Sequence, residues 1–200
     1  MTSYKSIVKS AETELIIKYS RFIGTACPIE DSEMAERLLE EIRTRYKDAS
    51  HNCYAYIVDD GHMRFSDDGE PQGLAGTPIL SVLKKRGLEK VLVVVTRYFG
   101  GVKLGGGGLV SAYSAAASAV LEKAGVKIYT KNVIAKLKFE YEKTKNVDLI
   151  IKQNGARLLE AKYLEEVNSL IAIEQEKWQD MKKTIMGFNI GIEDESIRFI

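Results

Sequence analysis

Several features that would mark a particular class of protein are scarce or missing in this sequence. It contains two cysteines and three prolines in 200 residues, and two cysteines are too few for the disulfide framework of a small secreted domain. No hydrophobic stretch approaches the roughly 20 residues of a membrane-spanning helix. The N-terminal segment MTSYKSIVKS lacks the apolar stretch of a signal peptide. We therefore expect a cytoplasmic protein with no membrane partner.

An excess of charge of one sign is also missing. The 29 lysines and arginines nearly balance the 28 aspartates and glutamates, which leaves a formal net charge of +1. The chain as a whole therefore has no electrostatic attraction to nucleic acid, and any binding of RNA must depend on a local cluster of cations. The content of hydrophobic residues, 45%, is that of an ordinary globular protein, and the length allows one large domain or two small ones.

The motifs of familiar enzyme and metal-binding classes are missing as well. The sequence contains no GK[ST], GxSxG or HExxH. Cys27, His51, Cys53 and His62 do not have the spacing of metal ligands, so we predict neither a metal nor another cofactor. His51 and Cys53 alternate along an expected strand, where such side chains lie about 7 Å apart rather than in hydrogen-bond contact. We assign no catalytic residue, and an enzyme is the less favoured interpretation.

The sequence does contain a block that is rich in both glycine and charge. A first turn reads SDDGEPQGLAGTP at residues 66–78, and a strand with a second turn reads VLVVVTRYFGGVKLGGGGLVSAY at residues 91–113. Glycine at this density is typical of backbone that adopts positive φ or closely approaches another group. Beside charged residues, such backbone indicates a functional surface more than a mere connection.

The second turn has the composition of an anion-binding loop. A helix is expected to begin near Leu109, and the backbone N–H groups before it would face an anion together with Arg97 and Lys103. The alternative is that the glycines only allow the strand and the helix to pack closely. The predicted cradle consists of two cations and four consecutive glycines: Arg97, Lys103, Gly105, Gly106, Gly107 and Gly108.

Aromatic residues near these cations are candidates for stacking on nucleic-acid bases. We expect Tyr98 and Tyr113 to be exposed and Tyr98 to belong to the ligand-binding surface. Phe99 is expected to lie in the core at the end of the strand.

The first turn is acidic and permits several interpretations. Asp67, Asp68 and Glu70 could hold a divalent cation or take part in acid–base catalysis. They could also form an ordinary turn, or an ion pair with the arginine of the second turn, and turn chemistry explains every residue of DDGEP. We favour the structural interpretation and expect the three carboxylates to line the site. His51 and Ser66 are candidates for its wall.

The pattern of the whole chain predicts an α+β fold in two domains. In the first part, DSEMAERLLEEIRTRY at residues 31–46 is the clearest helix, because its apolar residues recur at helical spacing. After residue 130 the glycine density falls, so we place a domain boundary near residues 130–132. The second part has the order β-α-β-β-α-β of a ferredoxin-like domain, with elements expected at 133–141, 144–153, 157–163, 166–174, 176–186 and 188–193.

Long contiguous motifs carry a family resemblance. SDDGEPQG, AGTPIL, VTRYFGG and KLGGGGLV occur in this order, after SRFIGTACPI and HNCYAYIV, and together they resemble the bacterial, YigZ-type branch of the IMPACT family. The resemblance implies an Impact N-terminal-like domain at 1–130, similar to domain 2 of ribosomal protein S5. It also implies a ferredoxin-like domain at 131–200, similar to domain V of the translocation factor EF-G. Ser111 stands where the family commonly has an arginine.

Two hypotheses about function follow. The favoured one is a non-catalytic binding protein that regulates translation by contacting RNA or the ribosome through the predicted anion cradle. The alternative is an enzyme (a hydrolase, a peptidase or a phosphoryl-transfer enzyme) that acts on a small substrate in the same groove with help from the acidic turn. The family's eukaryotic members carry an additional interaction domain, so their protein partner is not transferred to this chain.

Overall fold

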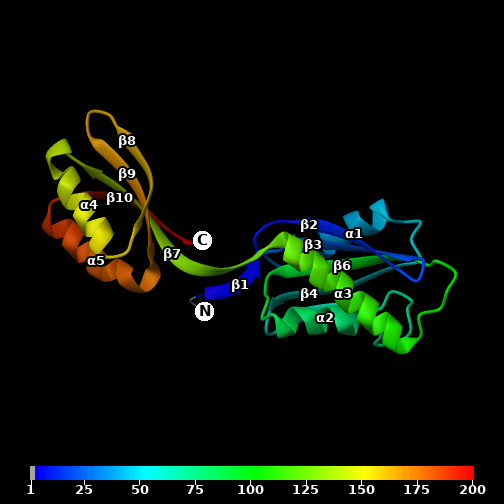
Figure 1. The fold of residues 1–200 in the computed structure, drawn as a ribbon. Coiled ribbons are helices and arrows are strands. Elements are labelled where there is room, and N and C mark those ends of the chain that lie inside the picture. The colour runs from blue at the N-terminus through cyan, green and yellow to red at the C-terminus, as the bar shows by residue number, and fades with distance from the viewer. Residues whose placement is uncertain (1–2) are drawn as a thin grey trace. The chain divides into compact units, whose positions relative to one another are not determined.

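The structure, a computed structural model, describes residues 3–200 and divides them into two compact units (Figure 1). The first unit spans residues 4–128, and the second comprises residues 129–200 with Ser3. Helices and strands alternate in both units, so the predicted α+β fold in two parts is confirmed. No helix within residues 3–200 is long and apolar enough to cross a membrane.

The first unit is built on an antiparallel sheet in the order β2-β3-β6-β4-β5. The central strand β6 begins with the run VLVVV, which is completely buried, as expected for a strand covered on both faces. The elements of this unit are β1 (Ser3–Ile7), β2 (Ala11–Ile17), β3 (Ser20–Pro28), α1 (Ser32–Arg45), β4 (His51–Asp59), β5 (His62–Ser66), α2 (Gly76–Lys85), β6 (Val91–Tyr98) and α3 (Gly106–Ala124).

Helices α2 and α3 cover one face of this sheet, and α1 covers the other (Figure 1). Side chains alternate along a strand, so Val93 and Val95 of β6 join the core beneath α2 and α3, whereas Leu92 and Val94 join the core beneath α1. The same alternation directs Arg97 toward the α2 and α3 face, at the end of a buried apolar row.

Local sequence explains the positions of the two long helices. Asp31 accepts a hydrogen bond from the backbone N–H of Met34 at 2.8 Å and caps α1, which agrees with the predicted helix. Helix α3 begins at Gly106, three residues earlier than expected, and its small buried residues let it approach the sheet closely. A Cβ atom on Gly24 of β3 would lie 2.9 Å from the carbonyl oxygen of Ala116.

The second unit has the predicted order β-α-β-β-α-β, with strands in the order β10-β7-β9-β8. Both helices pack on one face, and Trp178, Met181 and Ile185 of α5 lie in the core as expected. The last strand covers residues 191–199 instead of 188–193. The elements are β7 (Val126–Phe139), which begins in the first unit, a 3₁₀ turn (Tyr141–Lys143), α4 (Thr144–Gln153), β8 (Arg157–Tyr163), β9 (Val167–Glu174), α5 (Gln175–Gly187) and β10 (Gly191–Phe199).

Candidate functional site

The acidic turn and the end of β6 meet in a buried ion pair. Arg97 Nη1 lies 2.5 Å from Glu70 Oε1, and their side chains are only 6% and 4% exposed. The hydroxyl group of Tyr113, from α3, donates to the same carboxylate oxygen at 2.8 Å. The second guanidinium nitrogen, Arg97 Nη2, donates to Ser20 Oγ at 3.4 Å. The positive charge of Arg97 is therefore compensated by Glu70 inside the protein and does not face the solvent.

Aromatic rings enclose the same arginine. The guanidinium carbon of Arg97 lies 5.4 Å from the ring centroids of both Phe22 and Phe99, within the range of a cation–π contact. Arg97 Nε is buried and has no hydrogen-bond partner among residues 3–200. The arginine thus joins β3, β6, the acidic turn and α3 in one cluster.

The two aspartates of the acidic turn bind backbone groups. Asp67 reaches the start of α2, where its carboxylate accepts hydrogen bonds of 2.9–3.0 Å from the N–H groups of Gly73, Ala75 and Gly76. Such contacts satisfy N–H groups that a helix start leaves without partners. Asp68 accepts a hydrogen bond of 2.6 Å from the backbone N–H of Asn52 in β4. These contacts agree with the favoured structural interpretation of the turn.

The candidates for the wall of the site, His51 and Ser66, also contact the acidic turn. Ser66 Oγ accepts a hydrogen bond from the N–H of Asp68 at 3.1 Å. His51 Nδ1 lies 2.8 Å from the carbonyl oxygen of Asp68. A carbonyl only accepts, so Nδ1 carries the proton, and His51 Nε2 then lies 4.0 Å from Glu70 Oε1. The imidazole therefore holds the turn through one nitrogen and faces its glutamate with the other.

Cys53 completes this buried cluster. Its sulfur lies 2.9 Å from the carbonyl oxygen of Asp67 and 3.3 Å from the hydroxyl oxygen of Tyr113. Burial raises the pKa of the Cys53 thiol to about 12, and burial together with Cys53 and Glu70 raises the pKa of Tyr113. Neither group ionises near neutral pH, so the thiol is not an activated nucleophile.

The raised pKa of Cys53 predicts a loss of stability in alkaline solution. Below an ordinary thiol pKa near 9, Cys53 is protonated in both the folded and the unfolded chain. Between pH 9 and about 12, the unfolded chain loses this proton while the folded chain keeps it. The contribution of Cys53 to the free energy of unfolding should therefore fall by up to about 1.4 kcal/mol per pH unit.

Denaturant unfolding of the wild type and Cys53→Ala across this pH range measures that contribution. The difference in the free energy of unfolding between the two proteins should shrink as the pH rises. A difference that stays constant up to pH 12 would show that Cys53 is not held protonated by the fold.

The glycine-rich turn is an exposed loop followed by the first turn of α3. Gly101 and Gly105 have φ values of +84° and +75°, which favour glycine. Gly100 needs the absence of a side chain for another reason, because a Cβ there would lie 2.1 Å from backbone atoms of Tyr19. No side chain of the described residues 3–200 caps the start of α3, where Gly106, Gly107 and Gly108 supply the first N–H groups. Lys103 is exposed and forms no ion pair with any carboxylate among residues 3–200.

The aromatic residues require two corrections. Tyr113, expected to be exposed, is fully buried, and Phe99, expected in the core, is 49% exposed. Tyr113 faces inward because its hydroxyl group finds Glu70, whereas β6 ends at Tyr98 and Phe99 follows outside the sheet. Tyr98 is half-buried, and its hydroxyl group donates to Asp48 at 2.9 Å.

Sequence reasoning missed Tyr19. It is 80% exposed at the turn between β2 and β3, and its backbone lies against Gly100. Both Lys18 and Tyr19 have positive φ, at +45° and +65°, which is uncommon for residues other than glycine. The sequence shows only that Lys18 and Tyr19 connect two short strands. The position of Tyr19 beside Gly100 depends on the register of β3 with β6.

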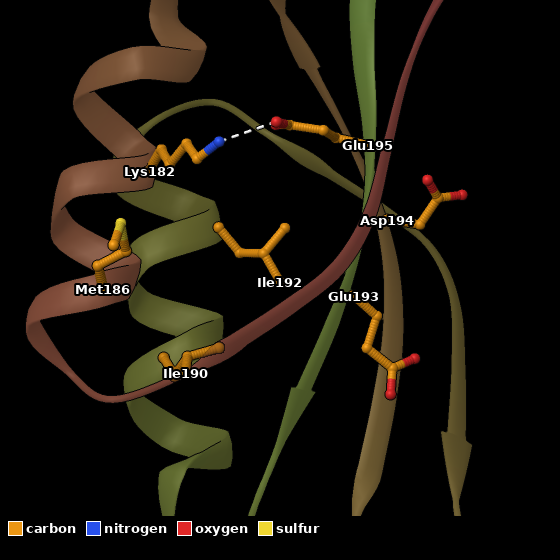
Figure 2. Close-up of a pocket in the computed structure, with 7 residues that line it drawn as sticks. All are labelled: Lys182, Met186, Ile190, Ile192, Glu193, Asp194 and Glu195. Carbon is orange, nitrogen blue, oxygen red and sulfur yellow. Dashed lines mark hydrogen bonds and ion pairs between the residues drawn. The ribbon is translucent and has the colours of Figure 1, made fainter.

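A separate hollow of about 520 Å³ lies in the second unit between α5 and β10 (Figure 2). Figure 2 shows Ile190 and Ile192 directed toward the helices, while Glu193 and Asp194 point away from them. Lys182 Nζ lies 2.8 Å from Glu195 Oε1 across this hollow. None of the predicted site residues lines it.

Comparisons with known proteins agree on one family. A model of the Impact N-terminal domain matches residues 18–121, which include both the acidic turn and the glycine-rich turn described above. The chain is 35% identical over 177 residues to the IMPACT family member YvyE of Bacillus subtilis, covering 88% of this chain and 82% of that relative. The protein belongs to the IMPACT family.

Two further matches extend over most of this IMPACT family chain. It is 31% identical to the family member YigZ of Escherichia coli over 179 residues, which cover 88% of each chain. A crystal structure of a hypothetical protein matches with a TM-score of 0.65 and 29% identity, covering 96% of this chain and 97% of that one. The resemblance seen in the sequence motifs is thus confirmed across both units.

Proposed function

We propose that this IMPACT family protein is a non-catalytic, cytoplasmic binding protein that acts in translation by contacting RNA or the ribosome. The contact is made by the glycine-rich surface, which we define as Lys103, Gly105–Gly108, Tyr19, Tyr98 and Phe99. The observation that carries the proposal is the start of α3, which has no side-chain cap among the described residues, beside the exposed Lys103, which has no carboxylate partner among them. N–H groups at a helix start and a nearby cation favour a phosphate group.

The aromatic part of this surface suits single-stranded nucleic acid. Exposed rings stack on bases while cations contact the phosphates, and Tyr19 and Phe99 offer such rings at 80% and 49% exposure. Arg97, part of the predicted cradle, is instead committed to Glu70. We assign to Arg97 the positioning of the loop that follows it.

Binding is favoured over catalysis because the acidic turn is occupied by internal contacts. Asp67 binds the start of α2, Asp68 binds β4, and Glu70 binds Arg97 and Tyr113. An enzyme using these carboxylates would have to break contacts that hold the turn in place. The family resemblance, with two domains similar to consecutive domains of a translocation factor, supports the ribosome as the site of action.

Sedimentation with ribosomes in a series of salt concentrations tests this function. We expect the wild type to sediment with ribosomes at low salt and to dissociate as the salt concentration rises, because phosphate contacts release counterions. Lys103→Ala should weaken binding, and Lys103→Ala/Tyr19→Ala should weaken it further. These substitutions are preferable to Arg97→Ala, which removes a buried partner of Glu70.

Lys85→Ala is the matched control, since it removes the same charge from an exposed position on α2 in the same unit. It should bind as the wild type does. Absence of association at low salt, or an equal loss in Lys85→Ala and Lys103→Ala, would contradict the proposed function.

A further inference from the structure

Strand β8 forms an unprotected edge of the sheet in the second unit. It pairs with β9 on one side, and no strand within residues 3–200 pairs with its other side. Large apolar side chains gather along it: Leu158, Leu159, Tyr163 and the following Leu164 are between 47% and 67% exposed. Edge strands offer unpaired backbone groups to another strand, and proteins usually protect such edges with proline, charged side chains or bulges.

The charges of β8 give little such protection. Lys162 Nζ lies 3.0 Å from Glu160 Oε1 of the same strand, so the two charges compensate each other. A bulge in the pairing with β9 occurs between Leu158 and Glu160, but the register from Glu160 to Tyr163 is regular. This regular stretch presents one acid and one base on either side of Ala161.

We propose that β8 pairs antiparallel with β8 of a second copy of this chain, with the two-fold axis at Ala161. A two-fold antiparallel pair places one residue opposite its own copy. With Ala161 in that position, Glu160 of each copy lies opposite Lys162 of the other. The same register brings Leu159, at the bulge, next to Tyr163 of the other copy, so exposed apolar residues at both ends of the regular stretch cover one another.

The neighbouring registers are less favourable. An axis at Glu160 would place the two copies of this carboxylate opposite each other and Leu158 opposite Lys162. An axis at Lys162 would place two ammonium groups opposite each other and Glu160 opposite Leu164. Like charges directly across a strand pair are destabilising and opposite charges are stabilising. The charge pattern of β8 therefore selects the axis at Ala161, and with it a second copy as the occupant of this edge.

Sedimentation equilibrium of the full chain tests the dimer independently of the proposed function. We expect the wild type to show a dimer whose population rises with protein concentration. Glu160→Lys would place two cations opposite each other at both ends of the strand pair, and Lys162→Glu would place two anions opposite each other there. Each single variant should therefore dimerise at least about tenfold more weakly.

The decisive arm mixes the two single variants. In the mixture, the cations of one chain meet the anions of the other, so a heterodimer should form with roughly wild-type affinity. Lys145→Glu, on the exposed face of α4, is the control for a charge reversal elsewhere and should dimerise as the wild type does. A wild type that stays monomeric at all concentrations, or single variants that dimerise as well as the wild type, would overturn the proposal. So would a mixture that stays as weak as its components.

Discussion

Replacing Glu70 by alanine should lower the free energy of unfolding of the first unit by about 3–5 kcal/mol. The substitution leaves the guanidinium group of Arg97 buried without its carboxylate, because both side chains are at most 6% exposed. It also removes the acceptor of the Tyr113 hydroxyl group. A buried cation that loses its partner is strongly destabilising. Urea unfolding followed by circular dichroism measures the change.

Two comparisons make this result specific to the buried pair. Arg64→Ala breaks the exposed ion pair with Glu36 and should change stability little. The double variant Glu70→Gln/Arg97→Met, which removes both charges and keeps similar volumes, should recover much of the loss. If Glu70→Ala were no more destabilising than Arg64→Ala, the pair would not hold the acidic turn to β6.

Gly100→Ala should be nearly as damaging, with a loss of about 3 kcal/mol. The added Cβ would lie 2.1 Å from the carbonyl carbon and oxygen of Tyr19. Backbone atoms cannot move aside as the end of a flexible side chain can, so β6 and the turn between β2 and β3 must separate. The hydrogen bond from the Gly100 N–H to Ser20 Oγ, at 3.2 Å, would be strained at the same point.

Gly107→Ala is the matched control for this substitution. Gly107 lies in the first turn of α3, has no atom within 4 Å of an added Cβ, and does not have a positive φ. Alanine there should leave the thermal midpoint unchanged or raise it slightly, since glycine inside a helix is entropically costly. A thermal midpoint of Gly100→Ala equal to that of Gly107→Ala would contradict the close approach of the two segments.

The sequence predicted those features that depend on local pattern. The amphipathic helix α1 and the β-α-β-β-α-β order of the second unit follow from periodicity and turn residues. Tyr113 illustrates a misinterpretation of such a pattern. It was expected to be exposed as a ring for stacking on bases, but its spacing of four residues from Leu109 and from Ala117 matches the buried face of α3. Its hydroxyl group is satisfied there by Glu70.

The candidate site depends on contacts between distant segments, which one sequence does not contain. Phe22, His51 and Arg97 become neighbours only through the registers of β3 and β4 with β6. The pairing of the acidic turn with Arg97 was one of several interpretations, and the structure shows it as a buried ion pair. The exposure of Tyr19 beside Gly100 likewise required the register of β3 with β6.

The salt dependence of binding to single-stranded RNA tests the central claim most directly. We would measure the affinity of the wild type, Lys103→Ala and Lys85→Ala for a fluorescent oligonucleotide of mixed sequence. The proposed function predicts affinity that falls steeply with salt, and a slope of log affinity against log salt that is smaller by about one for Lys103→Ala but unchanged for Lys85→Ala. Affinity independent of salt, or identical slopes for all three proteins, would contradict a phosphate contact at the glycine-rich surface.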